Sequence, residues 1–276
     1  MGIISIDIGG SKIIFAKIVK NKVIKKTEIL KFSKTNKNKL LETLKENIIK
    51  LDKKPSAVCI GVPSIIDNGK CIEPQNIKSL NGLNLKKILE KEFPTKVYLS
   101  NDSNCFALGE YYFGKAKNYS SAVCITIGTG ISAGIIINKK LLLGKSFGAG
   151  EIGRIPYNNK EEIEDLCSSK FFLKTKLTGE EVYKLAENGN KNAKLIFNKF
   201  GQNLGIVIST IINIINPDVI VLGGRIAKSR RYFEKEMYAY AKKFTYNKTF
   251  KETKIVFSDN KNSSLLGAAL LPKLKE

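Results

Sequence analysis

The stretch LSNDSN at positions 99–104 places two reactive side chains where one element ends and another begins. The strand-like run KVYL ends here and the helix-like run CFALGEYYFG follows, so Asn101 and Asp102 lie at a strand-to-helix junction. A polar residue at such a junction commonly caps the helix by accepting a backbone N–H bond. A carboxylate there could instead accept the proton of a substrate hydroxyl, as phosphoryl transfer to an alcohol requires. The stretch alone leaves both roles open for Asp102.

Two glycine-containing turns form a second group of candidate residues. The first, Gly9-Gly10-Ser11-Lys12, follows Asp7, which could hold a metal-bound water. The second, Gly128-Thr129-Gly130, precedes Ser132 and Gly134. Glycine lets backbone N–H groups approach a phosphate closely, because no Cβ intervenes. The first turn lacks the GxxxxGK[ST] spacing of a Walker A loop, so a plain hairpin turn is its alternative. Two such turns together favour binding of a triphosphate from two sides.

A third glycine pair and several polar residues complete the candidate set. Gly223-Gly224 ends the apolar run VIVL and could lie against a nucleoside or simply form a tight turn. Side chains that could hold the hydroxyls of a polyol are Asn76, Asn101, Glu151 and Glu164. Taken singly, each is more often a solvated surface residue.

The composition limits the classes of function. The net charge of +22 comes from lysines spread along the chain and from only four arginines, whereas specific DNA readers cluster arginines on one face. We therefore expect no nucleic-acid partner. The five cysteines are scattered without a CxxC motif, which indicates a reducing cytoplasm. The absence of an 18-residue apolar run or a signal peptide predicts no membrane partner.

The segment that opens the chain returns near its middle. ISIDIGGSKIIFAKIVKNKVI and ITIGTGISAGIIINKKLLLG both read as strand, glycine turn, strand, Asn-Lys turn and third apolar run. We therefore expect an α/β protein with two related mixed-sheet lobes and a ligand-binding cleft between them. The expected domains are 1–115 and 116–276, with a last helix over 263–274 that could pack back on the first domain.

Eight motifs occur in an order that resembles one known family. They are DIGGSK, IGVP, EPQNI, NDSNCFALGE, ITIGTGISAG, GAGEIGR, VIVLGG and SSLLGAAL. Together they span nearly the whole chain and resemble the ROK family of sugar kinases and repressors. The resemblance implies the two-lobed actin-like (ribonuclease H-like) ATPase fold, ATP with Mg²⁺, phosphorylation of a hexose 6-hydroxyl, and a homodimer.

The resemblance also implies a role for each matching residue. Asp102 would be the catalytic base and Asn101 a ligand of a sugar hydroxyl. Asn76, Glu151 and Glu164 would also bind the sugar. The phosphates of ATP would lie at the turns that contain residues 9–12 and 128–134, near Asp7, and the adenosine would lie against Gly223 and Gly224.

One segment departs from the family pattern. The family has a histidine after GEIG and then a cysteine-rich zinc loop, whereas this chain has Arg154 there, followed by YNNKEEIE, and contains no histidine. We therefore expect no zinc. The stretch EDLCSSK resembles the E-x-x-x-S motif that closes the loop in the family and matches its glutamate to Glu164. Hydrogen bonds or packing must then position Glu164 without the zinc. Arg154 could reach a sugar oxygen, pair with Glu151 or Glu164, or be a plain surface residue.

The choice of sugar rests on finer similarity. The P-x-N spacing at 74–76, the NDxxxxxxxE pattern at 101–110 and the LLGAALL ending look most similar to N-acetylmannosamine kinases of bacteria. Glucokinase is the alternative, and a non-catalytic sugar-binding regulator is a second one. A ROK-type repressor would need a helix-turn-helix ahead of the first strand, which is expected to begin at Ile3.

Overall fold

The computed structural model describes residues 2–30, 36–74 and 77–274, which form two compact units. The first unit comprises 1–117, 141–149 and 260–276, and the second comprises 118–140 and 150–259. The segments 141–149 and 260–276 thus group with the first unit, whereas the expected second domain is 116–276 with a last helix that could pack back on the first.

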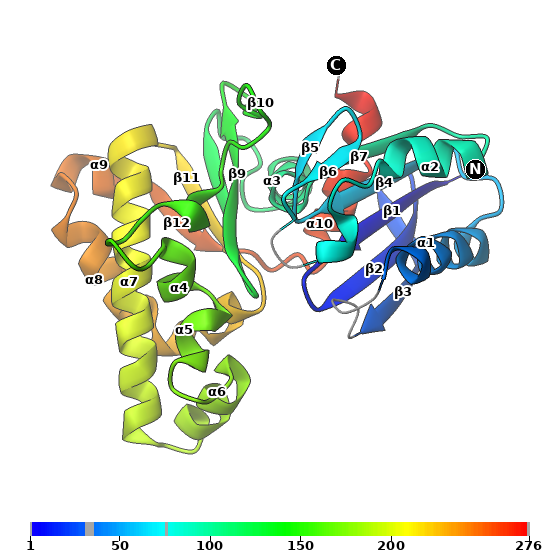
Figure 1. Cartoon of the computed structure of the whole chain (residues 1–276). Helices are drawn as coiled ribbons and strands as arrows, with labels where there is room; N and C mark the ends of the chain where they lie inside the picture. Colours follow the sequence, from blue (N-terminus) through cyan, green and yellow to red (C-terminus); the bar gives the residue numbers. More distant parts are fainter. Residues whose placement is uncertain (1, 31–35, 75–76, 275–276) are drawn as a thin grey trace. The chain divides into compact units, whose positions relative to one another are not determined.

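The first unit contains a five-stranded sheet with the order β3-β2-β1-β4-β7 (Figure 1). β1 pairs antiparallel with β2 and parallel with β4, which in turn pairs parallel with β7. Every residue of β4 is buried, as expected for a central parallel strand covered on both faces. The strands are β1 (Ile3–Ile8), β2 (Lys12–Val19), β3 (Lys22–Leu30), β4 (Ala57–Val62) and β7 (Val97–Asn101).

Four helices accompany this sheet: α1 (Lys37–Leu51), α2 (Leu85–Glu92), α3 (Asp102–Phe113) and α10 (Ser263–Ala268). Smaller elements are the hairpin β5 (Ile65–Asp67) and β6 (Lys70–Ile72) and the 3₁₀ turns η1 (Lys78–Leu80) and η4 (Leu271–Lys273). α1 buries Leu40, Leu44, Ile48 and Leu51 in the core of this unit. Their spacing of three to four residues places them on one face of the helix.

α3 and α10 lie in close contact, although 150 positions separate them in the chain (Figure 1). A Cβ placed on Gly109 of α3 would lie well under 3.0 Å from the carbonyl oxygen of Ser263. A Cβ on Gly267 of α10 would meet the carbonyl oxygen of Cys105 at a similarly impossible distance. The two helices can therefore approach this closely only because both positions are glycine.

A buried carboxylate joins the same two helices. Glu110 is 0% exposed, and its carboxylate accepts a 2.5 Å hydrogen bond from Ser263 Oγ and a 2.9 Å bond from the backbone N–H of Lys115. The last residue of the NDxxxxxxxE pattern therefore fixes α10 and the end of α3.

The second unit repeats the sheet order of the first, as β10-β9-β8-β11-β12 (Figure 1). β8 is antiparallel to β9 and parallel to β11, which is parallel to β12. The duplicated mixed sheets expected from the repeat are confirmed. The strands are β8 (Ala122–Ile127), β9 (Ile131–Ile137), β10 (Lys140–Leu141), β11 (Val219–Gly223) and β12 (Lys254–Phe257).

The longest helix of this unit is α7, which spans Lys191–Ile215 and places its apolar side chains in the core. The others are η2 (Ile152–Arg154), α4 (Ile163–Cys167), α5 (Ser169–Leu173), α6 (Gly179–Glu187), η3 (Ile226–Tyr232), α8 (Glu234–Lys243) and α9 (Asn247–Glu252). By length and hydropathy α7 could cross a membrane, but 61% of its most apolar window is buried within the protein. It therefore has the character of a core helix.

Candidate active site

The parallel strands of the first unit bring the predicted polar residues to one edge of the sheet. In the strand register, Asp7 pairs with Gly61, Gly61 with Ser100, and Val62 with Asn101. These positions are at the carboxyl ends of β1, β4 and β7. Two strand spacings, about 10 Å, separate the β1 and β7 positions of this row. The carboxyl edge of a parallel sheet is where ligands of α/β proteins usually bind.

Gly61 allows the start of α3 to lie close against β4. A Cβ on Gly61 would lie 3.2 Å from Cys105 Sγ and 3.4 Å from Asp102 Cα, so even alanine would press on the helix. Burial raises the pKa of the Cys105 thiol well above its usual value, and the charges of Asp7 and Asp102 raise it further. The thiol is therefore neutral at physiological pH.

The cap of α3 is Asn101, and Asp102 is the first residue of the helix. Asn101 Oδ1 accepts the Ser103 N–H at 2.8 Å. Asp102 Oδ1 accepts the same N–H at 2.9 Å. The interpretation of Asp102 as the cap is therefore wrong, because its neighbour holds that position. Because Asn101 caps the helix, the backbone of Asp102 is held at the edge of the sheet, and the Asp102 side chain is not needed as the cap.

The first glycine turn is Gly9-Gly10-Ser11, which links β1 to β2. The Gly9 N–H donates to the Lys12 carbonyl at 2.9 Å. Lys12 itself lies in β2, and its ammonium pairs with Glu28 at 3.0 Å. Burial raises the pKa of Asp7 to about 6, although the charges of Lys12 and Lys26 oppose this rise. A bound cation would favour the ionised form of Asp7.

The second glycine turn, Gly128-Thr129-Gly130, has the same length and links β8 to β9. The Gly128 N–H donates to the Gly130 carbonyl at 2.9 Å. Ser132 and Gly134 lie beyond the turn in β9, and Gly134 pairs with Cys124 of β8. Gly134 is therefore part of the sheet, and the turn itself comprises three residues.

Two neighbouring segments support this second turn. Gly223 ends β11, and Gly224 has a φ of +91°, which glycine adopts without strain. A Cβ on Gly224 would overlap the backbone of Ile127, which immediately precedes the turn. On the α5 side, the Ser169 N–H donates to Gly128 O at 2.9 Å, and Ser169 Oγ donates to Thr129 O at 3.2 Å.

The Glu164 carboxylate lies against the same turn. A Cβ on Gly130 would lie well under 3.0 Å from Glu164 Oε2, so the glycine provides the space that this oxygen occupies. A Cβ on Gly153 would be 3.4 Å from the Glu164 Cβ, which places η2 beside it. Glu151 immediately precedes η2, and the carbonyl of Gly150 accepts the Ala133 N–H of β9 at 2.8 Å. The predicted sugar ligands Glu151 and Glu164 therefore both lie beside β9.

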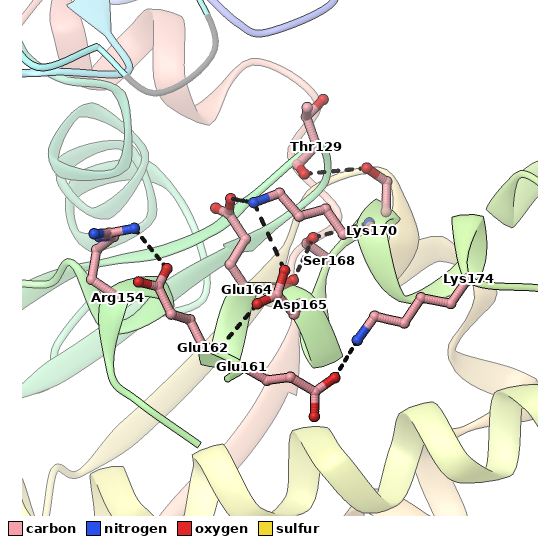
Figure 2. Close-up of polar contacts among 10 residues, drawn as sticks. Thr129, Arg154, Glu161, Glu162, Glu164, Asp165, Ser168, Lys170 and Lys174 are labelled. Atoms are coloured by element: carbon pink, nitrogen blue, oxygen red, sulfur yellow. Dashed lines mark hydrogen bonds and ion pairs between the residues drawn. The ribbon is translucent and has the colours of Figure 1, made fainter. Parts of the chain in front are cut away.

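Ion pairs and hydrogen bonds stabilise the segment where the family has its zinc loop (Figure 2). Arg154 pairs with Glu162 at 2.7 Å, which is neither of the two acidic partners expected for it. Glu161 pairs with Lys174 at 2.5 Å, and Glu164 pairs with Lys170 at 2.8 Å. Throughout the described residues, no three cysteine, aspartate or glutamate side chains are grouped as metal ligands would be.

One predicted ligand, Asn76, lies outside the described residues. No individual role was predicted from the sequence for Gly61, Glu110 or Lys170. Gly61 is in the IGVP motif and could have been found from it. Lys170 carries no signal, because the chain has 47 lysines and arginines and most of them face solvent.

The sequence profile of the ROK family matches residues 3–275. An uncharacterized protein from Clostridium perfringens is 32% identical over 277 residues, covering 94% of this chain and 93% of its own length. A xylose repressor from Caldicellulosiruptor bescii is 27% identical over 263 residues, covering 81% of this chain but 65% of the repressor.

Solved structures share the fold. A ROK family glucokinase from Streptomyces griseus, crystallised with glucose and AMPPNP, superimposes with a TM-score of 0.86 at 20% identity, covering 99% of this chain and all of the glucokinase. A Listeria monocytogenes protein thought to be an N-acetylmannosamine kinase gives a TM-score of 0.84 at 23% identity and covers 98% of this chain and 97% of its own. The predicted actin-like ATPase fold is confirmed.

Proposed function

Since this chain belongs to the ROK family, we propose that it is an ATP-dependent sugar kinase that phosphorylates the 6-hydroxyl of a hexose or N-acetylhexosamine. The observation that carries the proposal is the row of residues at the carboxyl ends of β1, β4 and β7 in the first sheet. Asp7 lies at the end of β1 beside a glycine turn, and Asp102 begins α3 at the end of β7. One carboxylate near the phosphates and another near the hydroxyl is the pair that phosphoryl transfer requires.

The proposed reaction is a direct transfer. The sugar 6-oxygen attacks the γ-phosphorus of ATP, and its proton passes to the Asp102 carboxylate. The bond from the γ-phosphorus to the bridging oxygen breaks, and ADP leaves with that electron pair. A positioned base of this kind contributes roughly two to four orders of magnitude in rate.

The two glycine turns are proposed to hold the phosphates, with Gly223 and Gly224 beside the adenosine. Mg²⁺ neutralises charge on the phosphates when it is bound with ATP. Asp7 fits a role in holding it, since its carboxylate is a hard oxygen ligand and its raised pKa of about 6 reflects burial that a cation would compensate.

N-Acetylmannosamine is the proposed sugar, so the product would be its 6-phosphate and the pathway sialic acid catabolism. The similarity of the P-x-N spacing and of the C-terminal motif supports this choice. Glu110 of the NDxxxxxxxE pattern contributes less, because it bonds Ser263 in the core. Glucose is the alternative substrate, supported by the fold shared with the Streptomyces griseus glucokinase.

A cytoplasmic, homodimeric and zinc-independent enzyme is part of the same proposal. All five cysteines are buried thiols, which suits a reducing compartment. The dimer rests on the family resemblance. Zinc independence rests on the ion pairs that occupy the segment after Arg154.

A coupled ADP-release assay across hexoses and N-acetylhexosamines tests the proposal. We expect sugar-dependent ADP formation that is fastest with N-acetylmannosamine and unchanged when zinc is chelated and Mg²⁺ is replenished. Faster turnover of glucose would reassign the substrate. Sugar binding without ADP formation from any sugar would instead support the non-catalytic regulator.

A further inference from the structure

Lys170 is the cation that faces the Glu164 carboxylate from the following helix. Its Nζ lies 2.8 Å from Glu164 Oε1 and 4.0 Å from Asp165 Oδ1 (Figure 2). The side chain of Glu164 is only 14% exposed, whereas that of Lys170 is 48% exposed. The pair thus joins a largely buried carboxylate to an ammonium that reaches in from the surface.

The two oxygens of Glu164 have different neighbours. Oε1 receives the Lys170 ammonium, and Oε2 occupies the space beside Gly130 in the second glycine turn. Burial of a carboxylate without a partner is costly, and a charge-assisted hydrogen bond restores part of the lost solvation. Lys170 therefore fixes the orientation of this side chain.

The backbone that carries Lys170 is itself anchored. Its N–H donates to Ser168 Oγ at 3.1 Å, and Ser168 Oγ donates to Glu164 O at 2.6 Å. The adjacent Ser169 bonds to Gly128 O and Thr129 O in the glycine turn. The ammonium therefore approaches Glu164 from a short helix that is fixed to the turn.

We propose that Lys170 is the positioning residue for sugar binding by Glu164, performing the task that a zinc-bound loop performs in the family; this role rests on the proposed function. Lys170 acts through Glu164 and does not touch the transferred phosphoryl group. The hydrogen bond to Glu164 raises the pKa of Lys170, so the ammonium stays charged through the physiological range.

The chain offers a matched control in Lys174. Its ammonium pairs with Glu161 at 2.5 Å, and its side chain is 45% exposed, close to the value for Lys170. We expect Lys170→Met to raise the KM for sugar about tenfold, the size of one lost charged hydrogen bond, with kcat and the KM for ATP within about twofold of wild type. Lys170→Arg should restore most of the sugar affinity, and Lys174→Met should behave as wild type.

A double-mutant cycle separates positioning from a general structural effect. In a Glu164→Gln background, Lys170→Met should add less than about twofold to the sugar KM, since the carboxylate that it orients is gone. Thermal unfolding of each variant shows whether the fold is intact. A rise in the KM for ATP with Lys170→Met would overturn the inference in favour of a phosphate contact, and an unchanged sugar KM would overturn it outright.

Calorimetric titration of the sugar without ATP provides a readout that does not need turnover. Wild-type protein that binds sugar but releases no ADP would contradict the proposed function, while a weaker sugar Kd in Lys170→Met would still support the inference. Wild-type turnover with equal sugar Kd values in both proteins would contradict the inference alone.

Discussion

Asp102 and Glu164 are both carboxylates at candidate sites, but the molecule supports them in different ways. Asp102 begins a helix that is fixed by buried contacts: its crossing with α10 at two glycines and the bonds of Glu110. Glu164 lies in a five-residue helix, and its carboxylate is fixed by an ion pair with a half-exposed lysine. The contacts that support Asp102 also hold the unit together, whereas those that support Glu164 are local.

This difference predicts two kinds of failure. Changes in the buried contacts of α3 should cost free energy of unfolding before they change any kinetic constant. Changes around Glu164 should cost less stability than changes in α3 and should mainly alter sugar binding, because the lysine of its ion pair is half exposed to solvent.

The largest expected effect is that of Gly267→Ala. The added Cβ meets the rigid carbonyl of Cys105, and this clash outweighs the gain of about 1 kcal/mol from helix propensity. We expect the variant to lose several kcal/mol of stability or to accumulate unfolded, as measured by thermal unfolding followed by circular dichroism. Gly148→Ala is the control, since its Cβ would lie 3.7 Å from Ile65 Cδ1. Wild-type stability of Gly267→Ala would contradict the close crossing of the helices.

Glu110→Ala is expected to have the next largest effect, and it tests the buried hydrogen bond between α3 and α10. It removes the carboxylate that accepts from the buried Ser263 Oγ and from the partly buried Lys115 N–H, which costs about 3 kcal/mol. Chemical denaturation measures this loss, and Lys115→Ala, which keeps the backbone N–H, serves as control. At temperatures where Glu110→Ala is folded, its sugar KM should equal that of wild type. A raised sugar KM with unchanged stability would show that this glutamate belongs to the site.

The strands and their repeat could be predicted because runs of β-branched residues and glycine turns are local signals. β1 begins at Ile3, as predicted, whereas the last helix, expected over 263–274, ends at Ala268 and is followed by the 3₁₀ turn η4. The two-sheet arrangement followed from the similarity of two segments. The contact of Gly109 with α10 had no such signal, because the two glycines are 158 positions apart and each is an ordinary helix residue in its own segment.

The candidate site was predicted only where a motif carried it. Asp102, the two turns and Glu164 lie within motifs. The partner of Arg154 could not be predicted, since Glu151, Glu162 and Glu164 are all within reach of a long side chain. Lys170 could not be singled out among so many lysines. Asn101 is the cap because α3 begins at Asp102, one residue earlier than a cap at Asp102 would require.

Glu164→Ala is expected to have a moderate effect that is confined to sugar binding. The sugar KM should rise at least about tenfold, because a charged hydrogen bond to a sugar hydroxyl is lost. The unfolding temperature and the KM for ATP should change little. Equal changes in both Michaelis constants, measured in the ADP-release assay, would contradict a local role for this carboxylate.

The smallest expected effect is a pH dependence, which concerns Asp7 at the end of β1 in the first unit. The pKa of Asp7 is raised to about 6 from 3.8, so the folded protein binds its proton more tightly than the unfolded chain. This group therefore makes folding less favourable as pH rises from 4 to 6, while ionisation of Asp7 favours binding of Mg²⁺ with ATP. We expect kcat/KM for ATP to fall below pH about 6. The charge of Lys26 lowers the pKa of Asp7, so Lys26→Met should move this fall in kcat/KM to higher pH. A fall at an unchanged pH would mean that another group titrates.

The proposed phosphoryl transfer depends most directly on Asp102 as the proton acceptor. The decisive measurement is the sugar-dependent rate of ADP release by wild type and by Asp102→Asn under saturating ATP and sugar, with circular dichroism and calorimetric sugar titration as checks. The amide retains the size of the side chain and can accept the Ser103 N–H, so the variant should fold and bind sugar. We expect kcat to fall by at least about a hundredfold. Turnover near that of wild type would contradict the assignment of Asp102 as the base.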